Sequence, residues 1–217
     1  MSHLVKSTLS SQIYDILKED IIQGTIKPGE KLTLKFLQER FQVSSTPIRE
    51  ALTRLTEDSL VTYYSNVGIR VVELTKGDLE EIYQFIGDLD SIAIRYAYDN
   101  GNYEAMLKDM TDNITDSQKY LQIQDTKNWI LCSDSFHLIA YNYCGNKRLL
   151  TSAEKMRGQL TIVSASYEQK LEYQEKIQKE HEEIYELIEA HNIAEAQKKM
   201  KEHLNHSLSI ALENRDA

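Results

Sequence analysis

Apolar residues recur at intervals of three and four along most of this 217-residue chain. That spacing places them on one face of an α-helix. The chain has only two prolines and eight glycines, so few positions interrupt the pattern. The pattern therefore predicts a mainly α-helical protein.

Two short helices that share one core are predicted between Leu34 and Leu60. The apolar positions of the second helix repeat at helical spacing and are Ile48, Ala51, Leu52 and Leu55. Before it lies the run SSTP, in which a hydroxyl group can cap the helix and proline fits the first turn. We expect this second helix to begin at about Thr46.

A further helix, from about Leu9 to Ile21, is predicted before this pair of helices. A β-hairpin is predicted after the pair. The runs VTYY and GIRVV are rich in β-branched and aromatic residues, and residues 65–68 supply the turn. Three helices followed by two strands is the plan of a winged helix-turn-helix domain. We expect this domain to span residues 1–74.

The second helix of the helix-turn-helix pair presents its N-terminal residues to base edges in the major groove of DNA. Arg49 lies there, and its planar guanidinium group matches O6 and N7 of guanine. The hydroxyl groups beside it suit phosphate oxygens, and the tip of the wing can reach the minor groove or the backbone. The candidate contacts are Ser44, Ser45, Thr46, Arg49, Asn66, Gly68 and Arg70. A three-helix unit with a purely structural role is the alternative.

The stretch LTLKFLQERFQVSSTPIREALTRLTEDSLV, followed by SNVGIRVVELT, resembles the DNA-binding domain of the GntR family of bacterial regulators. The resemblance implies that Lys35 also contacts DNA. Ser45 stands where the family usually has arginine, and Ser59 stands where it usually has glycine. The operator sequences of relatives are therefore not carried over to this chain.

About six further helices are predicted as an all-helical bundle over residues 78–217, after the boundary sequence ELTKGD. The net charge is -9, which argues against indiscriminate coating of nucleic acid. Residues 1–75 hold nine basic and nine acidic residues, so the acidic excess lies in the second part. A neutral first part with cations near the reading helix can still meet phosphate groups locally.

The chain start lacks the build of a signal peptide, and no apolar run approaches the length of about 18 residues that a membrane span needs. We expect a cytoplasmic protein without membrane contact. Cys132 and Cys144 are twelve residues apart in one predicted helix, too far to form a disulfide, and are interpreted as small buried residues.

Three histidines lie in the apolar seams of three different predicted helices: His137, His181 and His203. Helical bundles build metal sites from side chains that project inward from facing helices. A single histidine on an apolar face is more often a core residue bonded to a neighbour. Both interpretations stay open. The other histidines, His3, His191 and His206, fall at helix ends or on less regular faces.

The stretches SFHLIAYNYCGN and HEEIYELIEAHNIAEAQKKMKEHL resemble the FCD domain of the FadR subfamily, a helical domain that binds effectors and forms dimers. The resemblance implies a divalent metal ion, such as zinc, nickel or manganese, on the three histidines and one aspartate. The usual aspartate position is Ser133 here, and Asp134 is the candidate fourth ligand in its place. The alternatives are that water takes the fourth position or that metal affinity is lost.

The resemblance also implies an effector site on the first bundle helix, at Tyr83, Ile86 and Asp90. The effector class it implies is a small organic acid. Ile86 stands where the family often has an arginine that would bind the acid, and that departure puts the effector class in question.

Together these features predict a homodimeric transcription regulator, and not an enzyme. It would bind an inverted repeat in double-stranded DNA under the control of a small molecule. A helical metalloenzyme and a ligand-binding adaptor are the alternatives. The chain lacks the His-Glu-x-x-His and paired Glu-x-x-His signatures, which counts against the metalloenzyme.

Overall fold

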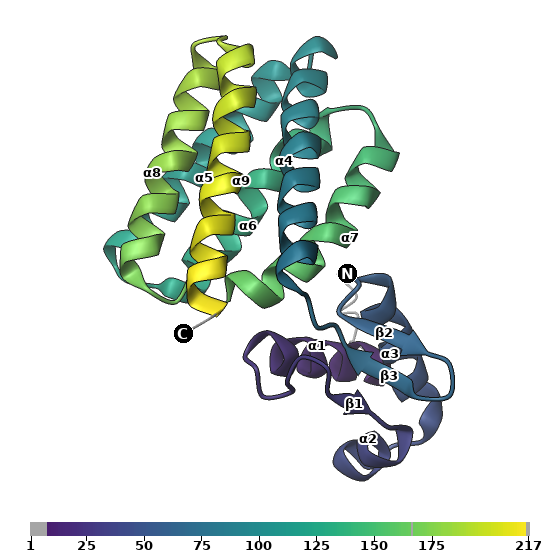
Figure 1. Ribbon diagram of the computed structural model, residues 1–217. Helices are drawn as coiled ribbons and strands as arrows, with labels where there is room; N and C mark the ends of the chain where they lie inside the picture. Colours follow the sequence, from purple (N-terminus) through teal and green to yellow (C-terminus); the bar gives the residue numbers. More distant parts are fainter. Residues whose placement is uncertain (1–7, 166, 216–217) are drawn as a thin grey trace, which may run out of the picture. The chain divides into compact units, whose positions relative to one another are not determined.

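The computed structural model describes residues 8–165 and 167–215, which are mainly helical (Figure 1). The chain separates into two compact units. One holds the residues up to Thr75 together with Lys155–Val163, and the other runs from Lys76 to Glu154 and from Ser164 onward. The architecture is a winged helix-turn-helix followed by a helical domain, which confirms the predicted fold class.

The first unit contains the three predicted helices and the predicted wing. Its helices are α1 (Leu9–Ile22), α2 (Leu34–Phe41) and α3 (Ser45–Glu57), and its strands are β1 (Lys31–Leu32), β2 (Val61–Tyr64) and β3 (Gly68–Val71). The strands form an antiparallel sheet in the order β1-β3-β2, with Val61 opposite Val71 and Tyr64 opposite Gly68. The strand β1 was not predicted.

One apolar core holds these elements together. Leu17, Leu37, Ile48 and Leu55 come from all three helices and are fully buried, and Leu60 closes the core where the wing begins. Burying a side chain of this size stabilises the fold by about 1.5–3 kcal/mol. The core therefore fixes α3 on its buried face and leaves its other face exposed.

The predicted hydroxyl cap of α3 does not form. The helix begins at Ser45, one residue before the expected position, and its N-cap residue Ser44 makes no side-chain capping hydrogen bond. A capping hydroxyl normally accepts from the N–H of the second or third helical residue. The third residue here is Pro47, which has no N–H to donate.

The second unit contains the six predicted helices, with ends that differ from the expectation by a few residues. They are α4 (Lys76–Asp99), α5 (Tyr103–Gln122), α6 (Thr126–Tyr143), α7 (Lys147–Ser164), α8 (Leu171–Glu189) and α9 (Ile193–Arg215). The end of α7 belongs to the first unit, as given above. Helix α4 packs against α9 and α6, while α8 packs against α9 and α5. No described helix has the length and apolar character of a membrane span.

Ser59 closes α3 in a left-handed backbone conformation, with φ at 58°. Its N–H donates to the carbonyl of Thr56 at 3.0 Å, and the next residue donates to Leu55 at 2.9 Å. Left-handed backbone costs a residue with a side chain roughly 1–2 kcal/mol. We predict that Ser59→Gly raises the free energy of unfolding of the first unit by about 0.5–1 kcal/mol, measured by denaturant titration. Ser59→Ala, which keeps the strain, should bring no gain; equal stability of the glycine variant and the natural protein would contradict this explanation.

Candidate metal centre and candidate DNA interface

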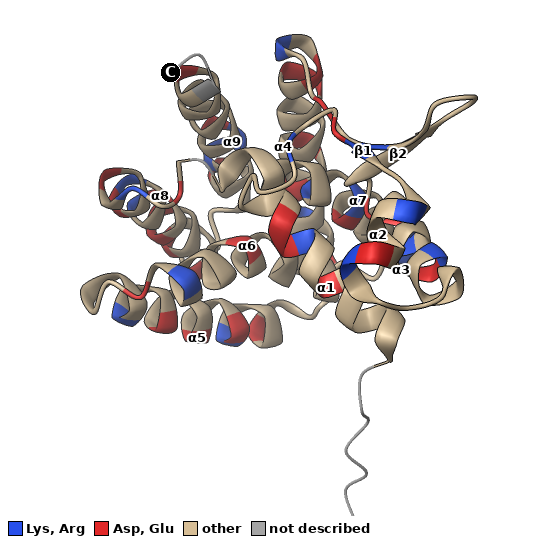
Figure 2. Cartoon of the chain, turned by 90° about the horizontal axis from the view of Figure 1, so that it is seen from below, with Lys and Arg blue, Asp and Glu red and all other residues tan. Residues whose placement is uncertain are grey.

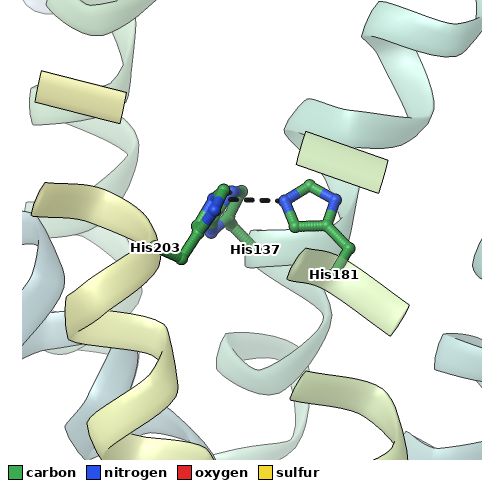
Figure 3. A group of neighbouring side chains, drawn as sticks. All are labelled: His137, His181 and His203. Carbon is green, nitrogen blue, oxygen red and sulfur yellow. Dashed lines mark hydrogen bonds between the residues drawn. The ribbon is translucent and has the colours of Figure 1, made fainter. Parts of the chain in front are cut away.

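Three buried imidazoles from three helices converge in the second unit (Figure 3). His137 comes from α6, His181 from α8 and His203 from α9, and these residues are 8%, 2% and 2% exposed. Nε2 of His203 lies 3.2 Å from Nε2 of His181 and 3.4 Å from Nε2 of His137. The structure thus brings together the three histidines singled out in the sequence.

The spacing of these nitrogens suits a divalent metal ion. Two nitrogens bound to zinc at about 2.0–2.1 Å and at a tetrahedral angle lie roughly 3.3 Å apart. Nδ1 of His137 and Nδ1 of His203 each face a carboxylate oxygen, at 3.0 and 2.7 Å. In a neutral imidazole the donor N–H is then Nδ1, so the Nε2 atoms of His137 and His203 keep their lone pairs. These lone pairs are the ligand atoms that a histidine offers to a metal ion.

The predicted fourth ligand, Asp134, is not part of this group. Among the described residues the donor atoms that lie together belong only to the three histidines. The charge of Asp134 acts instead on Glu168 and Tyr167, which follow α7, and contributes to a raised pKa of each. Although residues three and four before His137 both neighbour it on the helix, only the fourth, Ser133, is buried.

Asp90, an expected effector contact, lies behind His137. Its side chain is 1% exposed, with one oxygen 3.0 Å from Nδ1 of His137. Its other oxygen accepts a hydrogen bond from the hydroxyl of Tyr141 at 2.6 Å. This is the position of a carboxylate that orients a ligating histidine. The other expected effector contacts, Tyr83 and Ile86, are buried on the same helix α4.

Glu180 and His206 belong to the same network, and the sequence did not single them out for it. One oxygen of Glu180 lies 2.7 Å from Nδ1 of His203, and the other lies 2.6 Å from Nδ1 of His206. Burial alone would raise the pKa of Glu180, but hydrogen bonds and charge from both histidines outweigh burial and lower it. The available signal was spacing: His206 follows His203 by three residues on α9. The other histidine left aside, His191, stacks on Tyr103, and His3 lies outside the described residues.

A second buried acid, Glu168, lies outside the histidine group. Its side chain is 6% exposed, and its Oε2 has no hydrogen-bond partner among the described residues. Burial is the main cause that raises its pKa to about 8; the charge of Asp134 adds to the shift and a hydrogen bond with Ser164 opposes it. Glu168 therefore keeps its proton to a higher pH than an exposed glutamate does.

The candidate DNA contacts of the first unit lie at its surface. Ser44, Thr46 and Arg49 are placed at the start of α3, where Arg49 is exposed, and Lys35 lies on α2. Asn66 is exposed at the wing tip with φ at 65°. Gly68 has φ at 100°, a conformation that favours glycine and turns the chain into β3. The predicted set, with Ser45 as the first residue of α3, thus occupies α2, the start of α3 and the wing.

Three arginines of the first unit make contacts within the fold. Arg40 pairs with Asp20 at 2.6 Å, and Arg70 donates to the carbonyl of Gly29 at 2.7 Å. Arg54 lies 3.9 Å from the ring centre of Tyr14 and donates to Ser11 at 3.2 Å. One nitrogen of the Arg70 guanidinium is therefore engaged within the fold, and its wing contact with DNA stays a prediction.

The side chains of Lys31, Lys35 and Arg49 make no ion pair or hydrogen bond within the described part of the chain. Figure 2 shows cationic residues on α2 and α3. A hollow of about 660 Å³ lies between α3 and the sheet, and its lining includes Lys31, Arg49, Thr53 and Tyr63. Tyr63 is 66% exposed and was not predicted as a contact. The lining also includes Glu57 and apolar residues such as Leu52. Its cations and hydroxyl groups are of the kind that contacts a phosphate backbone.

Family models match both units. The model described as bacterial regulatory proteins, gntR family, matches residues 9–71, and the model of the FCD domain matches residues 81–206. The chain is 28% identical over 197 residues to the HTH-type transcriptional regulator YdhC of Bacillus subtilis, covering 90% of this chain and 87% of the relative. It is 28% identical over 207 residues to the HTH-type transcriptional repressor GlaR of Escherichia coli, covering 88% and 90%.

Solved structures share the fold. The structure of McbR/YncC of E. coli has a TM-score of 0.73 at 22% identity and covers 96% of this chain and 99% of that chain. A GntR-type transcriptional regulator of Rhodococcus sp. RHA1 has a TM-score of 0.74 at 21% identity, covering 95% and 98%.

The buried acid Glu168 predicts a pH dependence of stability. Its carboxyl group is protonated up to about pH 8 in the folded protein, but only up to about pH 4.5 when unfolded. The free energy of unfolding should therefore fall as the pH rises from about 4.5 to about 8. The slope should be at most roughly 1.4 kcal/mol per pH unit. In Glu168→Gln, which cannot ionise, denaturant titrations across this range should give a flatter profile. An unchanged slope would show that Glu168 does not cause the dependence.

Proposed function

Because the chain belongs to the GntR family of bacterial regulatory proteins and carries an FCD domain, we propose that it regulates transcription by binding an operator through α3, under the control of a small molecule held in its second unit. The observation that carries this proposal is the guanidinium of Arg49, exposed in the first turns of α3. Side chains in that position reach base edges in the major groove. A protein with this role works in the bacterial cytoplasm.

The proposed contacts divide by chemistry. Arg49 reads a guanine through O6 and N7, while Lys35 and the hydroxyl groups of Ser44, Ser45 and Thr46 bind phosphate oxygens. Ser44 suits this role because its hydroxyl is not used for capping. The wing tip, residues 66–68, approaches the adjacent backbone. Two copies of the chain related by two-fold symmetry would read an inverted repeat in double-stranded DNA.

We propose that the three histidines hold a divalent metal ion, with zinc, nickel and manganese as the candidates. The bound metal would supply a Lewis-acidic position that coordinates an oxygen of the effector, for which a small organic acid is the proposed class. Ile86 is fully buried and offers no charge to such an acid, so the metal would carry the electrostatic part of its recognition.

A regulatory role fits these residues better than catalysis. Both oxygens of Asp90 and both oxygens of Glu180 already bond to protein groups, which leaves neither free as a general base. The relatives named above are transcription regulators. An effector that prefers one arrangement of the protein by about 1–3 kcal/mol would change operator affinity some 5–150-fold.

Substitution of two arginines of α3 should affect different properties, operator affinity for Arg49 and stability for Arg54. Arg49→Ala should weaken operator binding by about 1–3 kcal/mol, in gel-shift titrations with fragments selected from the genome, and leave the melting temperature unchanged. Arg54→Ala should lower the melting temperature, because Arg54 packs on Tyr14, and lose less operator affinity. An Arg49→Ala protein with natural operator affinity would remove Arg49 from the proposed role.

The metal proposal predicts that the purified protein contains close to one transition-metal ion per chain, measured by elemental analysis. His181→Ala should lose this ion, because it removes one of three donors. The matched control is His191→Asn, which lies outside the group at a left-handed position that asparagine tolerates. Natural protein that takes up no metal even when supplied with zinc, nickel and manganese would refute metal binding and leave the DNA proposal standing.

A further inference from the structure

We propose that Glu180 is a positioning residue of the metal centre and that, together with Asp90, it supplies from behind the imidazoles the negative charge that a donor set of three histidines lacks. This inference rests on the proposed binding of a metal ion by His137, His181 and His203. It assigns a role to two residues that the three-histidine group itself does not contain.

The two carboxylates make the same kind of contact on two different helices. Asp90 of α4 lies 3.0 Å from Nδ1 of His137 on α6, and Glu180 of α8 lies 2.7 Å from Nδ1 of His203 on α9. A hydrogen bond to Nδ1 fixes the tautomer and the ring orientation of a ligating histidine. Each carboxylate therefore leaves Nε2 of its histidine as the ligand atom, and these two Nε2 atoms lie 3.4 Å apart.

The charge balance of the metal site also supports a role for the two carboxylates. Three neutral imidazoles around a divalent cation leave two positive charges in a buried place, which is costly without compensation. Asp134 is not part of the group, and Ser133 beside it carries no charge. Asp90 and Glu180 bring two negative charges to within one hydrogen bond of the ligands, so their sum balances the ion.

His206 holds Glu180 in place. One oxygen of Glu180 accepts from Nδ1 of His206 at 2.6 Å while the other faces His203, so a carboxylate of α8 bridges two successive turns of α9. Asp90 is held in a similar way, because its second oxygen accepts from Tyr141. The side chain of His206 is 38% exposed, so its removal leaves no large cavity in the core.

The test measures metal affinity in the full chain, with Zn²⁺ alone as the probe and a chromophoric chelator as competitor. Glu180→Gln should bind Zn²⁺ about 10–100-fold more weakly than the natural protein, the usual effect of losing such a partner. The matched control is Glu183→Gln on the same helix, whose carboxylate pairs with Lys199 at 2.5 Å outside the group. Its affinity should equal that of the natural protein. Melting curves without metal check that both variants fold.

A second variant keeps the test decisive if Glu180→Gln folds poorly. His206→Ala should also weaken Zn²⁺ binding, by less than Glu180→Gln, because Glu180 stays but loses its second anchor. The visible spectrum of bound Co²⁺ should shift in both variants, since the ligand rings reorient, and Glu180→Asp should restore part of the affinity. A purely structural role would change melting without moving the Co²⁺ spectrum.

The failures are distinguishable. If the natural protein binds neither Zn²⁺ nor Co²⁺, the proposed metal centre fails and this inference fails with it. If the natural protein binds both ions and the folded Glu180→Gln and His206→Ala variants bind them equally well, the metal centre stands and the positioning role of Glu180 is overturned.

Discussion

The contact of buried imidazoles with carboxylates behind them is the interaction on which the second unit depends. Burying a carboxylate costs several kcal/mol unless hydrogen bonds replace its water. Asp90 and Glu180 each receive two such bonds, and the partners come from α6 and α9. Four helices, α4, α6, α8 and α9, therefore share one polar network inside an apolar bundle. Control by an effector requires a ligand that prefers one arrangement of such a network over another.

In the first unit, the basic side chains divide into those that stabilise the fold and those that make no ion pair or hydrogen bond within the described residues. Three of its arginines stabilise the fold through Asp20, Tyr14 and Gly29, while Arg49 and two lysines make no such contact within the described residues. The sequence alone does not show which of these cations make contacts within the fold and which are exposed. Their division follows from which face of each helix or strand meets the core, and it leaves three cations exposed on a chain whose net charge is negative.

Periodicity predicted most of the fold, because a helix that buries one stripe repeats it for many turns. The same repeat placed three histidines on inward faces, and that part of the site could be predicted. Strand β1 could not, since two residues are too short to show an alternation. The contact of Glu180 with His203 could not be predicted, because α8 contains many acidic residues. The sequence does not distinguish a carboxylate that bonds to the protein from one that faces solvent. Asp134 lies outside the group of three histidines, and of the two positions beside His137 it is Ser133 that is buried.

The central claim is that Nε2 atoms of His137, His181 and His203 bind one metal ion together. X-ray absorption spectroscopy at the edge of the bound metal tests it most directly. The account predicts three imidazole nitrogens in the coordination shell, at about 2.0–2.1 Å for zinc. A shell of oxygen ligands without imidazole scattering would contradict it.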